Sequence, residues 1–140
     1  MDAIACEGVG KDYAHFTLKD IDLAVPAGTV MGFVGPNGAG KSTTLRILMG
    51  LVHQDRGQVR VLGHPMPEDQ IAAKWEIGYV SEDMRLHPTE SVAFHVELMA
   101  SIYPDWDSAY AESMLRRFGL EPSQKVKGLS HGQRVKAALL

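Results

Sequence analysis

The stretch Gly35-Pro36-Asn37-Gly38-Ala39-Gly40-Lys41-Ser42-Thr43 decides the fold of this chain. It matches the pattern G-x-x-x-x-G-K-[ST] from Gly35 to Ser42, and a chance match in a chain of this composition has a probability of roughly 0.6%. An apolar run from Thr29 to Val34 precedes the loop, and apolar or small residues follow it at helical spacing: Thr44, Leu45, Ile47, Leu48, Leu51 and Val52. Strand, glycine loop and helix in this order predict a phosphate-binding site.

The residue types in this loop suit a bound phosphate group. Glycines let successive backbone N–H groups converge on one anion, and the positive end of the following helix adds to their field. Lys41 offers a mobile positive charge for the β- and γ-phosphates, and the Ser42 hydroxyl is a hard oxygen ligand suited to Mg²⁺. Thr43 is expected either to cap the helix or to contact the α-phosphate.

Outward from the loop, hydrophobic patterning predicts further elements. The expected strands are Ile4–Val9, Phe16–Val25, Thr29–Val34, Gln58–Leu62 and Trp75–Val80, with turns at Gly10–Asp12 and Pro26–Gly28. Two amphipathic helices are expected between residues 88 and 119, the first capped by Thr89 and the second by Asp105 or Asp107. Gly119 is expected to end the second helix. We therefore predict an α/β fold with an N-terminal antiparallel β lobe and an inserted helical subdomain.

Composition excludes several classes of protein. The chain has 140 residues, 45% hydrophobic and 22% charged, which is typical of one globular domain. Its net charge of −3 argues against a general nucleic-acid binder, although Lys125, Lys127, Arg134 and Lys136 form a basic C-terminal stretch. The single Cys6 excludes an internal disulfide and is expected in the core. No apolar run reaches the length of a membrane span, and the N-terminus lacks a signal-peptide pattern.

A second motif, Leu129-Ser130-His131-Gly132-Gln133, lies near the C-terminus. Alone it predicts an N-capped amphipathic helix beginning at Ser130. Together with the glycine loop it resembles the ATPase subunits of ATP-binding-cassette transporters, whose signature reads Leu-Ser-Gly-Gly-Gln. The resemblance extends over the whole chain: Ile77 to Glu82 is similar to the family's strand leading into its Q-loop, and the two helices stand where the family has its helical subdomain. We accordingly divide the chain into a β lobe and loop core (1–86), a helical subdomain (87–124) and the signature region (125–140).

The resemblance implies the function. Gly35 to Thr43 would bind the phosphates of ATP with Mg²⁺, and an aromatic ring ahead of the loop, Tyr13 with Phe16 as the competitor, would stack on adenine. Leu129 to Gln133 would close in trans over the ATP of a second cassette, so a homodimer or heterodimer is implied. Membrane-spanning transporter subunits would be the partners, which would hold the protein on the cytoplasmic face of the cell membrane.

This sequence departs from the family pattern at two places. Glu82 stands where the family's Q-loop has glutamine; a carboxylate there offers an oxygen to Mg²⁺ but adds negative charge beside a triphosphate, and an ordinary solvated loop carboxylate is the alternative. His131 replaces the third signature residue, glycine, and adds both bulk and a group that titrates near pH 6.5 in its ordinary state.

The family's catalytic strand, four apolar residues followed by Asp-Glu, does not follow the signature within these 140 residues. We expect the general-base Glu beyond Leu140, a cassette cut short after its signature, and no ATP hydrolysis by this stretch alone. Two other functions stay open: an interaction fragment that binds ATP without hydrolysing it, and, more remotely, a small-molecule kinase with the same loop.

Overall fold

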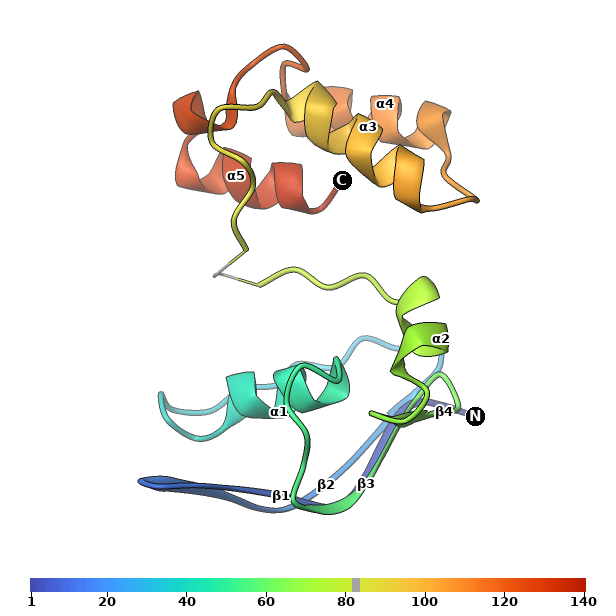
Figure 1. Cartoon of the computed structure of the whole chain (residues 1–140), viewed down its shortest axis with the longest axis vertical. Helices are drawn as coiled ribbons and strands as arrows, with labels where there is room; N and C mark the ends of the chain where they lie inside the picture. Colours follow the sequence, from blue (N-terminus) through green and yellow to red (C-terminus); the bar gives the residue numbers. More distant parts are fainter. Residues whose placement is uncertain (82–83) are drawn as a thin grey trace. The chain divides into compact units, whose positions relative to one another are not determined.

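The computed structural model describes residues 1–81 and 84–140. The chain divides into two compact units, Met1–Gly78 and Tyr79–Leu140. Figure 1 shows the sheet with helices α1 and α2 in the first unit, and a group of helices in the second.

The first unit is built on one antiparallel sheet with strand order β2-β1-β3-β4. The strands are β1 (Asp2–Tyr13), β2 (Phe16–Pro26), β3 (Arg56–Val61) and β4 (His64–Met66). They confirm the strands predicted from residues 4–9, 16–25 and 58–62. The turn predicted at Gly10–Asp12 is wrong, because β1 continues through those residues and reverses at Ala14–His15.

The core of the first unit lies between this sheet and helix α1 (Lys41–Leu48). The helix buries Thr44, Ile47 and Leu48 on one face, which is the i, i+3, i+4 spacing of an amphipathic helix. Its buried partners come mainly from the strands: Cys6, Val9, Leu18, Val59, Val61 and Met66. Cys6 is a core residue as predicted, and burial raises the pKa of its thiol to about 11, with the Asp22 charge a smaller cause.

Two predicted strands are absent from the described residues. Thr29–Val34 forms no ladder with a neighbour, although its side chains alternate as in a strand: Met31 and Phe33 line a cavity against the core, whereas Val30 is fully exposed and Val34 is 88% exposed. Trp75–Val80 is also not a strand, because Trp75 ends helix α2 (Gln70–Trp75) and residues 77–80 have no regular structure. Hydrophobic pattern sets which side chains point inward, but a strand also needs a hydrogen-bonding neighbour.

The second unit consists of α3 (Val92–Ile102), α4 (Ser108–Phe118), a 3₁₀ turn η1 (Val126–Gly128) and α5 (His131–Ala138). They enclose a second core that includes Val92, Leu115, Leu120, Val126 and Leu129. The two predicted helices, the Asp107 cap and the left-handed Gly119 at the end of α4 are confirmed. Thr89 is not the cap of the first helix; Ser91 is, since its hydroxyl accepts from Phe94 N at 3.0 Å.

Within the described part of the chain, none of the helices has the length and apolar character needed to cross a membrane.

The pairing of His64 with carboxylates predicts a pH dependence of stability. His64 Nδ1 lies 2.7 Å from Asp69 Oδ2, and this hydrogen bond, with Glu76 contributing less, raises the pKa of the imidazole. A raised pKa in the folded state stabilises the protein below the unfolded value and loses that effect as pH rises through the folded value. The gap in thermal stability between the parent and His64→Gln should therefore be widest near pH 5.5 and close above about pH 8. The exposed His15 provides a His15→Gln control, which should show no such closing gap.

Candidate phosphate-binding site

The backbone between Gly35 and Lys41 forms a loop that leads directly into helix α1. A turn is closed by Ala39 N donating to Pro36 O at 3.3 Å, and Gly38 and Gly40 adopt left-handed conformations with φ of 81° and 94°. Gly40 is the N-cap residue and makes no side-chain capping bond, and the first intrahelical bond is Thr44 N to Gly40 O at 2.8 Å. The N–H groups of residues 41–43 therefore have no partner inside the helix and are placed to bind an anion.

Lys41 brings a positive charge to the mouth of this loop. Its ammonium group donates to the carbonyl oxygens of Gly35 at 2.6 Å and Pro36 at 2.8 Å. The charge is therefore held at the start of the loop that ends in the N–H groups of residues 41–43. Ser42, the second residue of α1, is exposed at the helix N-terminus. Thr43 does not cap the helix, because Gly40 occupies that position and Thr43 lies within the first turn.

Gly40 also joins the loop to the β1/β2 hairpin. A Cβ atom at this position would lie 2.5 Å from Leu18 Cδ1 and 3.1 Å from Phe16 Cζ, so only glycine allows β2 to approach this closely. Leu18 is buried in the core and Phe16 packs against it. The position of the loop is therefore fixed by direct packing on the hairpin.

The two candidate aromatic residues stand at the end of this hairpin. Tyr13 and Phe16 are paired across the strands, and their ring centroids are 6.3 Å apart with planes inclined by 30°. Tyr13 is 45% exposed, whereas Phe16 is half-buried against the core. Lys11 Nζ lies 5.9 Å from the Tyr13 ring centroid. Of the two rings, Tyr13 offers the more accessible surface.

The residues of the second motif belong to the second unit, where they form the start of α5. Ser130 is the N-cap, and it exchanges two hydrogen bonds with Gln133: Gln133 N donates to Ser130 Oγ at 3.2 Å, and Ser130 N donates to Gln133 Oε1 at 2.9 Å. This capping box confirms the helix start predicted at Ser130. Leu129 is buried in the core of that unit, while His131 and Gly132 are exposed. Glu82, the predicted Q-loop residue, lies outside the described residues.

Sequence reasoning missed a group of charged residues beside the hairpin. Lys11 Nζ lies 2.7 Å from Asp55 Oδ1, and Arg56 Nη1 lies 2.6 Å from Asp12 Oδ2. These partners are 44 positions apart in the chain, so no local motif announces them. Only the pairing of β1 with β3 brings them together.

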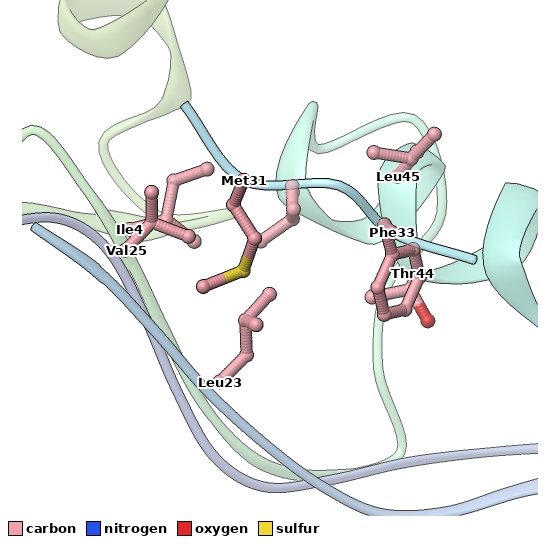
Figure 2. Close-up of a pocket in the computed structure, with 8 residues that line it drawn as sticks. Ile4, Leu23, Val25, Met31, Phe33, Thr44 and Leu45 are labelled. Atoms are coloured by element: carbon pink, nitrogen blue, oxygen red, sulfur yellow. The ribbon is translucent and has the colours of Figure 1, made fainter. Parts of the chain in front are cut away.

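A cavity of about 210 Å³ lies beside α1 but away from this chemistry. Figure 2 shows its lining, in which Met31 points toward Leu23 of β2, and Phe33 lies close to Thr44 and Leu45 of α1. All of its lining residues except Thr44 are hydrophobic: Ile4, Leu23, Val25, Met31, Phe33, Leu45 and Leu48. Such a lining offers nothing to a phosphate group, so the cavity belongs to the hydrophobic packing of the unit.

The antiparallel lobe, the glycine loop and the uncapped helix with its lysine define a P-loop nucleotide-binding domain of the α/β class. The family model described as ABC transporter matches residues 18–140, and the chain belongs to that family.

Curated relatives of the chain include a drug-resistance protein and an import protein. The chain is 33% identical over 138 residues to the daunorubicin resistance ATP-binding protein DrrA3 of Streptomyces coeruleorubidus, which spans 94% of this chain and 44% of that protein. It is 36% identical over 148 residues to the sulfate/thiosulfate import ATP-binding protein CysA of a Synechocystis strain. That match covers 98% of this chain and 40% of that protein. The chain thus spans less than half the length of these relatives.

Solved structures share the fold. The ATP-binding subunit of an ABC transporter matches with a TM-score of 0.86 at 24% identity, covering 98% of this chain and 60% of that one. CbiO1 from Clostridium perfringens, described as part of the ABC transporter complex cbiONQ, matches with a TM-score of 0.77, covering 99% of this chain and 59% of that one. The predicted fold class, an α/β P-loop cassette, is confirmed.

The packing of Gly40 on the hairpin predicts a stability difference between two glycines of the loop. Gly40→Ala should destabilise the first unit by about 2–4 kcal/mol, because it strains a left-handed residue and forces Leu18 and Phe16 apart. Gly38 has a similar φ of 81° but open space around it. Gly38→Ala should therefore cost only the conformational part, about 1 kcal/mol. Urea unfolding of both variants measures the difference. Equal losses in the free energy of unfolding would show that the close contact of residue 40 with β2 does not contribute to stability.

Proposed function

We propose that this chain binds ATP as the nucleotide-binding domain of an ABC transporter, and that residues 35–43 hold the triphosphate. The observation that carries the proposal is the convergence of the Lys41 ammonium and the N-terminus of α1 on one loop. A cation and several unpaired N–H groups at one place are what a multiply charged phosphate chain requires. Family membership supports the same ligand.

Tyr13 is proposed as the ring that stacks on adenine. Its ring is exposed beside the hairpin turn, and the hairpin packs on the phosphate loop through Gly40. Phe16 is less suited, because its ring already packs against the buried core. An aromatic face next to a phosphate site gives the base a surface on which to stack, and this stacking does not need hydrogen bonds to the polar groups of the base.

Mg²⁺ is proposed to bind with the nucleotide through the Ser42 hydroxyl. The described residues contain no group of three or more His, Cys, Asp or Glu side chains able to hold a metal ion. A single hydroxyl oxygen suits Mg²⁺, because this ion is commonly held by one or two protein oxygens together with substrate phosphates and water. Bound there, the ion would neutralise phosphate charge. A contribution from Glu82 belongs to the same proposal.

The signature residues 129–133 are proposed to act on the nucleotide of a second cassette, which makes a dimer the working form. Membrane-spanning subunits of an ABC transporter are the proposed partners, with the protein on the cytoplasmic face of the membrane. ATP hydrolysis would drive transport in that assembly.

Removal of the loop cation tests the phosphate site. Lys41→Ala should abolish detectable ATP binding by isothermal titration calorimetry, because a charge and a hydrogen-bond donor to the phosphates are lost together. Lys74→Ala is the matched control, since Lys74 is also a helical lysine of the first unit, and its ammonium group donates to Gln70 Oε1 at 2.6 Å, one turn earlier in α2. An affinity of Lys41→Ala within about threefold of the parent would contradict the phosphate site.

Substitution of Tyr13 tests the adenine site. Tyr13→Ala should weaken ATP binding by about 1–3 kcal/mol, the range for bases stacked on aromatic rings, whereas Tyr13→Phe keeps the ring and should cost little. Titration with inorganic tripolyphosphate, which has no base, should give the same affinity for all three proteins. Equal losses of ATP affinity in both variants would assign the effect to the tyrosine hydroxyl instead.

A further inference from the structure

The end of the β1/β2 hairpin extends beyond the rest of the sheet. Strand β3 begins at Arg56, which pairs with Gly10 of β1. Residues 11–13 of β1 continue past that point and pair only with 16–18 of β2. The hairpin end is therefore a two-stranded ribbon, and such ribbons are marginally stable in water without further support. Tyr13 stands on this ribbon.

Asp55 supplies the support that a longer β3 would have given. One carboxylate oxygen accepts from Asp12 N at 2.8 Å, in the place of a ladder bond, and the other accepts from Lys11 Nζ at 2.7 Å. Asp55 N in turn donates to Gly10 O at 2.8 Å. One residue before β3 therefore holds three consecutive residues of β1.

The side chain of Arg56 contacts the same ribbon at Asp12. Its guanidinium donates to both oxygens of Asp12, at 2.6 Å from Nη1 and 3.3 Å from Nη2. A two-point contact of this kind fixes orientation as well as distance. The pKa values of both Asp12 and Asp55 are lowered, the first mainly by the hydrogen bond from Arg56 and the second mainly by the bond from Asp12 N. Both carboxylates are thus stabilised in their charged form by this arrangement.

The ribbon is fixed to the phosphate loop on its other strand. Phe16 and Leu18 lie against Gly40, and Phe16 is the cross-strand partner of Tyr13. The ring of Tyr13 is therefore placed by contacts on two sides: the packing of β2 on the loop, and the ion pairs of β1 with the start of β3. Lys11, which bonds to Asp55, also lies 5.9 Å from that ring.

We propose that Lys11, Asp12, Asp55 and Arg56 form an anchor that positions Tyr13 for the adenine base, so that they set the affinity for a nucleotide without touching it. This inference rests on the proposed function, because it takes Tyr13 to be the stacking ring. The four are positioning residues, and their effect is on the base and not on the phosphates. Exposed ion pairs contribute little to global stability, so the anchor acts by holding the local alignment of the ribbon.

Asp55→Ala is the variant that removes both bonds of the carboxylate. We expect its dissociation constant for ATP to rise about three- to tenfold, a part of the full stacking effect, because the ring is aligned for only a fraction of the time. Its affinity for tripolyphosphate should stay within about twofold of the parent. Glu112→Ala is the control, since it removes an ion pair on α4, 3.8 Å to Arg116, that is more exposed than the Lys11–Asp55 pair and lies far from the hairpin in sequence. Thermal unfolding of each variant checks that the fold is retained.

A double-mutant cycle with Tyr13→Ala separates this inference from the proposed function. If the anchor acts through the ring, Asp55→Ala should cost no further ATP affinity once Tyr13 is alanine. Three results would each overturn the anchor and leave the stacking role intact. The first is that the losses of ATP affinity are additive, and the second is that Asp55→Ala loses tripolyphosphate affinity equally. The third is that Asp55→Ala loses no ATP affinity while Tyr13→Ala does. No loss in Tyr13→Ala itself would overturn the stacking role and the anchor together, while Lys41→Ala still reports on the phosphate site. Exchanging the partners, Asp12→Arg with Arg56→Asp, should recover part of what either single change loses.

Discussion

The contact between Gly40 and the β1/β2 hairpin determines how the first unit places its chemistry. Gly40 is at once the left-handed N-cap of α1 and the surface on which Phe16 and Leu18 pack. A helix N-terminus binds an anion only in the direction in which its N–H groups point, so the orientation of α1 on the sheet sets the orientation of the site. Because the same hairpin carries Tyr13, one glycine links the position of the phosphate loop to that of the aromatic ring.

Features that depend on neighbouring residues were predictable from the sequence. The glycine loop, the caps at Asp107 and Ser130 and the left-handed Gly119 all follow from the intrinsic preferences of a few adjacent residues, and the structure has them where the sequence indicates. Ser91 in place of Thr89 shows the limit of this reasoning, because both are good N-caps and the choice falls to the fit of the helix in its unit. The hydrophobic pattern predicts that a helix forms, whereas packing determines at which residue the helix begins.

Features that depend on distant partners were not predictable. The segment Thr29–Val34 has the alternation of a strand, with Met31 and Phe33 turned to the cavity of Figure 2, yet no strand pairs with it among the described residues. The contacts of Asp55 and Arg56 with β1 span 43 and 44 positions and depend on the register of two strands. The alternation of residues in the sequence predicts which face of the segment each side chain lies on. The hydrogen-bonding partners depend on which strands pair and in which register.

The capping box of α5 bears on how the signature residues meet a ligand. Ser130 Oγ accepts from Gln133 N, so its hydroxyl proton is left to donate outward. Gln133 Oε1 accepts from Ser130 N, which leaves the amide NH₂ as a donor. The hydroxyl O–H and the amide NH₂ are thus the donors that the two side chains keep, beside the N–H groups of residues 131 and 132 at the start of the helix. Donors grouped at a helix N-terminus suit an anion, which supports the proposed contact with a nucleotide of a second cassette. His131, the exposed first residue of α5, adds an imidazole at the position where the family signature has glycine.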